Sequence, residues 1–259
     1  MKKLCPFRLA ASFLLALLLW SSPSFAHDFW LSEHSALPGQ KMILTLGYGH
    51  NFPIGEEIPA ENLATRFQPV TLAGPSGSFV LTQGQETKLL VADKPTEPGL
   101  YVASGATTPL FLTQTTSGWV IKAKNEVENP VTSNLSAKYS KAIINVGGGK
   151  GDLLDKPVGH KLEFIPLSDP ADLKPGEAFS AKVLFQGEPL AGATVTALPA
   201  GLEEPVLQAT ADSLGLVSLK LDRPGLWRLM TEHLIEFEGD KTKADNELNI
   251  ATLTFKIPE

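Results

Sequence analysis

Hydrophobic positions recur in short runs along this chain, and polar or turn-forming residues separate one run from the next. The runs are rich in β-branched and aromatic residues, and Gly, Pro, Asn and Asp lie between them. Helical periodicity is scarce. Ten runs are expected to form strands: 41–46, 79–82, 89–92, 110–113, 119–122, 178–185, 194–197, 217–221, 227–231 and 250–257. This pattern predicts an all-β fold of immunoglobulin-like β-sandwiches.

A weak internal repeat indicates two such sandwiches. In each half a Pro-Gly turn precedes an early strand, at 37–40 and again at 174–177. Another Pro-Gly turn precedes a late strand, at 97–101 and again at 223–227. The distance between the two turns differs between the halves, so we interpret the repeat as a shared plan rather than a regular array.

The segment between the halves differs in composition. Residues 134–144 are expected to form a short helix, with Ser133 or Asn134 as its N-cap. Residues 147–151, Gly-Gly-Gly-Lys-Gly, predict a flexible linker. A phosphate-binding loop would need a strand before it and a helix after it that opens with Lys-Ser or Lys-Thr. The predicted organisation is a signal peptide at 1–26, an N-terminal β-sandwich domain at 27–130, a connector at 131–159 and a C-terminal β-sandwich domain at 160–259.

The C-terminal half has the pattern of one sandwich type. Strand, tight turn and strand follow one another over 183–195, a second turn enters a strand over 212–217, and a third does so over 224–229. This order resembles the transthyretin-like or carboxypeptidase-regulatory-like sandwich, which is of immunoglobulin type. The resemblance implies an accessory or binding module, although a fold by itself assigns no function.

Residues 1–26 have the three parts of a secretory signal. Three basic residues are followed by an apolar run over 9–20, and small residues stand at positions 24 and 26. The apolar run is shorter than the roughly 20 residues that cross a bilayer, and an uncleaved membrane anchor is the alternative interpretation. Cleavage after Ala26 would release the rest of the chain into the periplasm with His27 as its first residue.

The same cleavage changes the cysteine content and the charge. Cys5 is the only cysteine and lies in the leader, so no disulfide is expected to stabilise the remaining chain. Cleavage leaves 19 basic against 28 acidic residues, a formal charge of −9. Such an acidic chain is a poor partner for nucleic acid or for an anionic membrane surface, and it is compatible with attracting cations.

Histidine is the candidate metal ligand of this chain. A free N-terminal His27 would offer both its α-amine and its imidazole to one ion. His50 ends the sequence Gly47-Tyr48-Gly49-His50, where the glycines allow the backbone to approach closely and then turn. His233 follows the late strand of the second half. We predict that these three histidines hold a divalent transition-metal ion, in a site assembled in space because no close spacing such as H-E-x-x-H occurs.

Other residues near these histidines have weaker assignments. His34 and His160 are interpreted as surface or linker residues. Five carboxylates are interpreted as surface charges, with metal ligation or orientation of an imidazole as the alternative: Asp28, Glu33, Glu56, Glu57 and Glu232. Four aromatic residues are expected in the core, with a dry wall around the metal as the alternative: Phe29, Trp30, Tyr48 and Phe52.

Several motifs resemble the DUF4198 family of exported proteins. They are His27–Leu31 (His-Asp-Phe-Trp-Leu), Pro38–Gln40, Gly49–Pro53 (Gly-His-Asn-Phe-Pro), 162–167, 186–193 and 224–227. The resemblance covers nearly the whole chain after residue 26, and it implies a periplasmic component of nickel or cobalt uptake. It also implies that the family's leading histidine corresponds to His27, its Gly-His to His50, and a later histidine to His233.

The resulting hypothesis is a non-enzymatic periplasmic protein that binds Ni or Co, with Cu or Zn as alternatives, and passes the ion to a membrane uptake system. Two other classes stay open. The first is an immunoglobulin-like adhesion or chaperone module that binds partners by strand addition. The second is a copper enzyme in which His27 and another histidine hold the ion. A hydrolase is disfavoured, because no cysteine nucleophile follows residue 26 and no Gly-x-Ser-x-Gly motif occurs.

Overall fold

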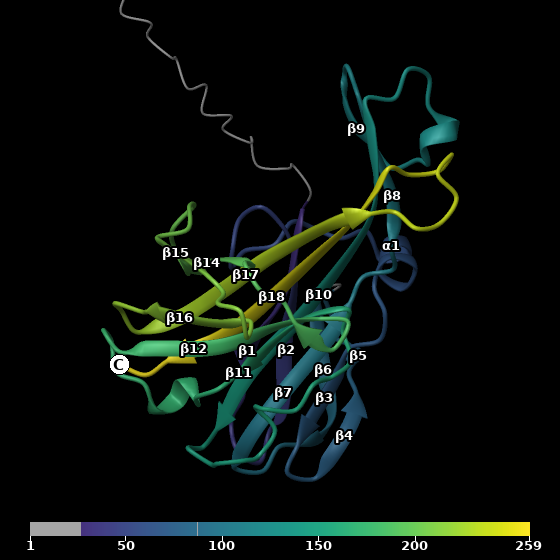
Figure 1. Cartoon of the computed structure of the whole chain (residues 1–259). Helices are drawn as coiled ribbons and strands as arrows, with labels where there is room; N and C mark the ends of the chain where they lie inside the picture. The colour runs from purple at the N-terminus through teal and green to yellow at the C-terminus, as the bar shows by residue number, and fades with distance from the viewer. Residues whose placement is uncertain (1–26, 87) are drawn as a thin grey trace, which may run out of the picture.

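The computed structural model describes residues 27–86 and 88–259, so the expected signal peptide at 1–26 lies outside the described residues. The described chain is built mainly from β-strands arranged in packed sheets, as the sequence predicted (Figure 1). Among these residues, no helix has the length and hydropathy needed to cross a bilayer. The helices of the described residues are all short. They are α1 (Ala60–Arg66) and the 3-10 helices η1 (Lys124–Glu126) and η2 (Pro170–Asp172).

A long mixed sheet crosses the middle of the molecule. Eight strands follow one another in the order β15-β14-β17-β18-β10-β7-β3-β4, and the β8–β9 hairpin extends the sheet beside β10. β10 and β18 run parallel, whereas β10 and β7 are antiparallel. The strands are β3 (Thr71–Gly74), β4 (Gly77–Val80), β7 (Gly99–Ala106), β8 (Leu110–Thr115), β9 (Gly118–Val120), β10 (Thr132–Val146), β14 (Thr194–Pro199), β15 (Leu207–Thr210), β17 (Gly225–Glu236) and β18 (Asn246–Ile257).

Two four-stranded sheets pack against this long sheet. The first has the order β1-β2-β6-β5, and the second has the order β11-β12-β13 with β16 also paired to β12. The first contains β1 (Asp28–Ser35), β2 (Lys41–Gly49), β5 (Thr82–Gln83) and β6 (Leu89–Pro95). The second contains β11 (Leu162–Pro166), β12 (Ala178–Phe185), β13 (Glu188–Pro189) and β16 (Leu216–Lys220).

Side-chain alternation along β10 shows that the two small sheets cover opposite faces of the long one. Ala142 and Ile144 pack into a core with the apolar residues of β1, β2 and β6. Ile143, between them in sequence, packs into a second core with the apolar residues of β11, β12 and β16. Since successive side chains of a strand point to opposite faces, β10 contributes to both cores, and β7 does the same through Leu100 on one face and Tyr101 on the other.

The observed strand β10 differs from the structure predicted for the connector. Residues 134–144 form the middle of this strand and not a helix. Five polar residues of the strand are buried: Ser133, Ser136, Lys138, Ser140 and Lys141. The alternation of polar and apolar residues that marks a half-exposed strand is therefore absent from the sequence. The division into domains at 27–130 and 160–259 stays a prediction, and β10 pairs with β7 of the first half and β18 of the second.

The two early Pro-Gly turns occupy equivalent places, as the internal repeat predicted. The backbone N–H of Gly39 donates to the carbonyl of Thr96, 2.8 Å away, just before the late turn of the first half. The N–H of Gly176 donates in the same way to the carbonyl of Leu221, 2.6 Å away, before the late turn of the second half. Each turn therefore fastens the start of an early strand to the entry of a late strand.

The aromatic residues after the two late Pro-Gly turns are equivalent as well. The hydroxyl of Tyr101 donates to the carbonyl of Glu97, four residues earlier, at 3.1 Å. The indole Nε1–H of Trp227 donates to the carbonyl of Arg223, also four residues earlier, at 3.0 Å. Both side chains are buried and close a corner of their sandwich, which supports a common plan for the two halves.

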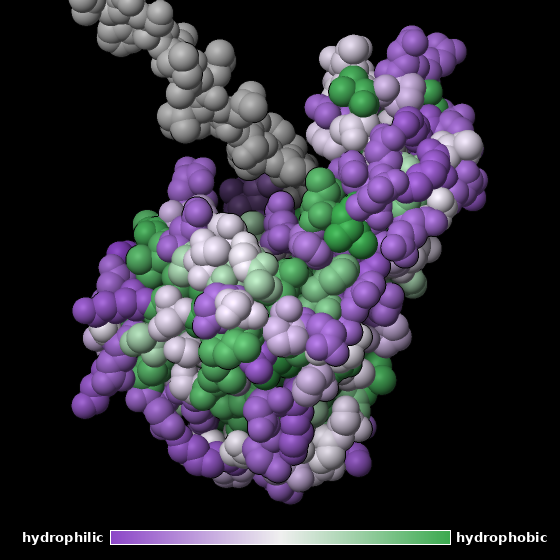
Figure 2. All heavy atoms as spheres, viewed as in Figure 1, coloured by the Kyte–Doolittle hydropathy of each residue, from purple (hydrophilic) through white to green (hydrophobic). Residues whose placement is uncertain are grey.

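An arm projects from the body of the molecule (Figure 1). It consists of β8, β9, the start of β10 and the chain between β17 and β18, and it is held by an ion pair between Lys124 and Asp245 and by the rings of Phe111 and Phe237, whose centroids are 6.1 Å apart. Its surface is largely hydrophilic, and apolar side chains gather where the arm meets the body (Figure 2).

Candidate metal centre

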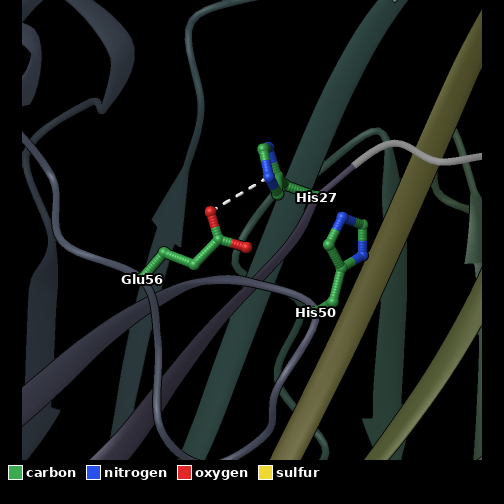
Figure 3. A group of neighbouring side chains, drawn as sticks. All are labelled: His27, His50 and Glu56. Atoms are coloured by element: carbon green, nitrogen blue, oxygen red, sulfur yellow. Dashed lines mark ion pairs between the residues drawn. The ribbon is translucent and has the colours of Figure 1, made fainter.

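His27 and His50 come together because β1 and β2 are antiparallel. His27 immediately precedes β1, His50 immediately follows β2, and the register pairs Asp28 with Gly49. The start of one strand therefore lies beside the end of the other. The centroids of the two imidazole rings are 4.7 Å apart (Figure 3).

Glu56 completes the group after the chain reverses direction beyond His50. The N–H of Glu56 donates to the carbonyl of Tyr48 at 2.7 Å, which returns this segment to the end of β2. One carboxylate oxygen of Glu56 then lies 3.1 Å from Nε2 of His27 (Figure 3). Gly49 makes this approach possible, because it has φ of +132° and a Cβ there would lie 2.7 Å from Cγ of Glu56.

The three side chains offer two nitrogen donors and one oxygen donor, and their ligand atoms all lie within 4.8 Å of one another. Donors that share an ion at metal–ligand distances of about 2.1 Å lie no more than roughly 4.2 Å apart. Small side-chain rotations are therefore enough to bring the donors onto one ion. The side chains of His27 and Glu56 are 39% and 45% exposed, so an ion reaches them directly from solvent.

The surroundings of His27 favour its neutral form. Desolvation lowers the pKa of this imidazole below its ordinary value of 6.5, and the Glu56 carboxylate opposes that shift. The nearby His50, Lys138 and Arg66 lower the pKa further. At neutral pH the ring is thus unprotonated, which is the form that coordinates a metal ion.

A layer of packed side chains from Asp28, Trp30, Phe52 and Arg228 lies behind His27. Asp28 forms an ion pair with Arg228 of β17, with 2.9 Å between Oδ2 and Nη1. The guanidinium carbon of Arg228 lies 5.5 Å from the ring centroid of Trp30 and 5.2 Å from that of Phe52. Gly47 has no side chain to oppose this packing, since a Cβ there would come within 2.0 Å of the Trp30 indole. The layer fixes the start of β1 and hence the position of His27.

The four aromatic residues near the histidines divide between the two predicted roles. Phe29 packs in the hydrophobic core beneath β1 and β2. Trp30 and Phe52 are buried in a small separate cluster. Tyr48 is half-buried and its ring centroid lies 5.0 Å from that of His27, so it forms part of the wall of the centre. Burial raises the pKa of the Tyr48 hydroxyl, with neighbouring Arg66 offsetting part of the shift.

His233 lies on the other face of the long sheet. The hydroxyl of Thr252 donates to the carbonyl of Phe29 at 2.7 Å, so Thr252 faces β1. Met230 pairs with Thr252 and shares this face, and alternation along β17 then turns His233 to the opposite one. The His233 ring lies against Phe185 of β12, with 4.5 Å between centroids. The structure therefore brings His27 and His50 together, with Glu56 and without His233.

The other two histidines also lie away from the group. His34 is exposed on β1. His160 packs against Tyr139, with 5.3 Å between ring centroids, and burial lowers its pKa to about 4.

Sequence reasoning underestimated Glu56 and missed two basic residues, Arg66 and Lys138. Glu56 was one of five carboxylates without a distinguishing signal, and only the chain reversal after His50 selects it. Arg66 ends a short helix and Lys138 lies in a strand predicted as a helix. A lysine on the inward face of a central strand is the signal that would have identified Lys138.

Several solved structures align with most of the chain at low similarity. Among them are a tetra-tandem repeat from the extending region of a large adhesion protein, at 12% identity over 89% of this chain and 49% of that chain, with a TM-score of 0.23. A second is Escherichia coli alpha-2-macroglobulin spanning domains NIE-MG1, at 10% identity over 88% of this chain and 98% of that chain, with a TM-score of 0.21. A third is a segment of two fibronectin type-III domains from chicken tenascin, at 12% identity over 86% of this chain and 98% of that chain, with a TM-score of 0.21. Similarity this low carries no argument about function.

Family comparison is more informative than these structures. No curated protein matches the chain. The model of the domain of unknown function DUF4198 matches residues 24–235, which include His27, His50 and Glu56 and end before β18. The chain belongs to the DUF4198 family.

Proposed function

We propose that this protein binds a divalent transition-metal ion through His27, His50 and Glu56, and that it serves metal uptake in the periplasm. The observation that supports the proposal is the convergence of two imidazoles and one carboxylate, with all ligand atoms within 4.8 Å. The three residues come from the start of β1, the end of β2 and the reversal that follows β2, so the fold and not a local motif assembles the group.

The donor set narrows the choice of ion. Imidazole nitrogen suits Zn, Cu, Ni and Co, whereas Mg and Ca prefer oxygen donors alone. Cleavage after Ala26 would add the α-amine of His27 as a fourth donor on the residue that already supplies an imidazole. Within this set the family resemblance favours Ni or Co.

The exposure of the group supports a role in transport. Structural zinc sites are usually closed by four protein ligands, whereas sites that exchange a ligand keep positions open. His27, His50 and Glu56 supply three side-chain donors at the surface, and His50 and Glu56 are both exposed. Open positions would allow a receiving membrane system to take the ion without unfolding the carrier.

Metal binding is tested first on protein isolated from the periplasm. Mass spectrometry of the intact chain is expected to give a mass that begins at His27, and metal analysis is expected to find one transition-metal ion per chain. A chain that begins elsewhere contradicts the participation of the α-amine, and a chain that takes up no first-row ion contradicts the whole proposal.

Calorimetric titration with Ni²⁺ and Co²⁺ then tests the ligands. His50→Ala and Glu56→Gln are expected to weaken binding by more than about 100-fold, because loss of a ligand exceeds the loss caused by removing a group that only orients one. His34→Ala is the control, since His34 is an exposed histidine of β1 outside the group, and its affinity should equal that of the wild type. Affinity should fall between pH 7 and pH 5 as protons compete for the imidazoles. Unchanged affinity in both ligand variants refutes the site.

A further inference from the structure

A small cavity lies beside the metal centre, where β8, β10 and the end of α1 meet. It has a volume of about 30 Å³ and is lined by Tyr48, Arg66, Thr107, Ser136 and Lys138, together with a few aliphatic residues from β8 and the segment after β9. Its lining contains two cationic side chains and several hydroxyl groups, and it contains no carboxylate. Such a lining offers hydrogen-bond donors and positive charge to whatever occupies it.

Lys138 is the basis of this site. It is 4% exposed, and its Nζ has a hydrogen bond to the hydroxyl of Ser136 at 3.2 Å. Among the described residues, no carboxylate forms an ion pair with Nζ, and Asp28 and Glu232 act on it only from a greater distance. Burial lowers the pKa of Lys138 to about 8, so the amine is still mostly protonated at neutral pH. A buried cation with no counter-ion in direct contact is costly, and an anion in the cavity would reduce that cost.

Lys141, on the same strand, is a buried lysine whose ammonium group has a charged partner. It is buried to a similar extent, but its Nζ forms an ion pair with Glu163 and donates to the carbonyl of Phe164 at 3.0 Å. Lys138 lies three residues earlier and points to the other face of β10. Its side-chain partner is the Ser136 hydroxyl, whereas the partner of Lys141 is a carboxylate.

Arg66 is the second cationic residue that lines the cavity. It is the last residue of α1 and is only partly exposed. Its planar guanidinium presents parallel N–H groups that match the two oxygens of a carboxylate. The room available is equivalent to roughly two water molecules, which is small for a tetrahedral anion such as phosphate.

We infer that the cavity between Arg66 and Lys138 binds a small planar oxyanion with a carboxylate-type group, of the size of formate or bicarbonate. Arg66 binds its two oxygens from one side, Lys138 neutralises its charge from the other, and the hydroxyl groups of Tyr48 and Ser136 complete its hydrogen bonds. The site exists in the metal-free protein and does not depend on the metal centre.

The position of the cavity also connects it to the metal centre, and this connection rests on the proposed function. Tyr48 lines the cavity and its ring lies against His27. Lys138 and Arg66 both repel positive charge at His27, as their effect on its pKa shows. An anion that neutralises them would strengthen binding of a cation at His27, His50 and Glu56. The substrate would then be a metal ion accompanied by a small carboxylate or carbonate.

The anion site is tested on chelator-treated, metal-free protein. Titrations with ¹³C-formate and, separately, ¹³C-bicarbonate are followed by the NMR signal of the anion, with acetate and phosphate as competitors. We expect saturable binding of formate or bicarbonate, weaker competition by acetate, and none by phosphate. Lys138→Met and Arg66→Gln should each weaken binding at least about tenfold, or 1.4 kcal/mol. Lys122 is exposed and follows the lining residue Ile121 in sequence, so Lys122→Met removes the same charge and should leave binding unchanged.

The outcomes separate the two proposals. Anion binding that is equal in wild type, Lys138→Met and Arg66→Gln overturns the site, as does phosphate competing as well as formate. Lys138→Met is expected to fold, because an apolar residue replaces an unpaired buried cation, and a thermal unfolding curve checks this; if Lys138→Met does not fold, the milder Arg66→Gln decides. The anion site should persist in His50→Ala, so a failed metal titration does not count against it. Formate should increase Ni²⁺ affinity in the wild type and not in Lys138→Met.

Discussion

Two histidine–glutamate groups occupy opposite faces of the long sheet, and they have opposite characters. In the metal centre, Glu56 is 45% exposed and its described polar contact is with His27. In the second group, Glu163 is 3% exposed and lies beside His160 and Lys141. Both groups contain histidine and glutamate, but the first group faces solvent and the second is enclosed between β10 and β11.

The difference lies in the partners that each carboxylate already has. Glu163 forms an ion pair with Lys141 and accepts hydrogen bonds from the backbone N–H groups of Val158, Gly159 and His160, at 2.6, 3.1 and 3.2 Å. Its oxygens are therefore fully engaged, and it fastens the chain before β11 to the sheet. Among the described residues, the Glu56 carboxylate has a polar contact only with the His27 imidazole, so it keeps unshared lone pairs beside two imidazoles. A histidine–glutamate pair becomes a binding site only where the fold leaves its donor atoms without other partners.

Glu163→Gln tests the structural half of this comparison. The substitution leaves Lys141 buried without a negative partner, so we expect the free energy of unfolding to fall by about 3–5 kcal/mol. Urea denaturation followed by tryptophan fluorescence measures the change. Glu56→Gln is the matched control, and its effect should stay within about 0.5 kcal/mol because Glu56 is exposed. Equal losses in the two variants would show that the groups do not differ as described.

Lowering the pH should reduce the stability of the wild type mainly through the enclosed group, which contains His160. The folded state holds the pKa of His160 at about 4, against an ordinary value of 6.5, so between these values the unfolded chain binds the extra proton. Stability is therefore complete above about pH 6.5 and is lost as the pH falls toward 4, by about 3 kcal/mol in total. Urea denaturation at intervals from pH 7 to pH 4 measures this loss.

His160→Gln removes the titrating group and should flatten that pH dependence. His34→Gln replaces an exposed histidine and should keep it. His27 contributes a smaller change of the same sign, because its pKa is also lowered. A pH profile in His160→Gln identical to that of the wild type would contradict a buried, neutral His160.

Much of the fold followed from the sequence, because short apolar runs and Pro-Gly turns are local signals. The runs at 41–46, 89–92 and 178–185 lie within strands of the structure, whereas the run at 79–82 is divided between β4 and β5, which belong to different sheets. The helix predicted at 134–144 is wrong, because the buried lysines and serines of β10 take their partners from distant strands. No local pattern reports such partners.

The metal centre could be predicted from the sequence only to the extent that strand pairing could be predicted. His27 and His50 flank two strands that pair directly, so their proximity follows from one hairpin. Placing Glu56 in the group requires the course of the chain after His50. Excluding His233 from it requires the direction of each side chain along β17. A shift of one residue moves a side chain to the other face of a sheet, and sequence alone did not fix that register.

Gly49→Ala tests how the position of Glu56 controls metal binding at the exposed group. The added Cβ would lie 2.7 Å from Glu56 Cγ, and φ of +132° is strained for alanine. We expect a loss of about 1–3 kcal/mol in stability from the strain, and at least tenfold weaker Ni²⁺ binding because Glu56 is pushed away, about 1.4 kcal/mol. Gly118→Ala is the matched control, since Gly118 has φ of +130° and nothing within 4 Å of the added Cβ. It should show the strain without the loss of affinity, and weaker binding in both variants would refute the steric argument.

His233→Ala should have the smallest effect on metal binding. His233 contacts Phe185 on the face of β17 that turns away from β1, so its imidazole cannot join His27 and His50 without a change in strand register. Calorimetric titration should give Ni²⁺ affinity within about twofold of the wild type, or 0.4 kcal/mol, while His50→Ala in the same assay loses binding. A large loss in His233→Ala would mean that both faces of the long sheet contribute to one site, for instance between two copies of the chain, and the opposition between an open group and an enclosed one would then fail.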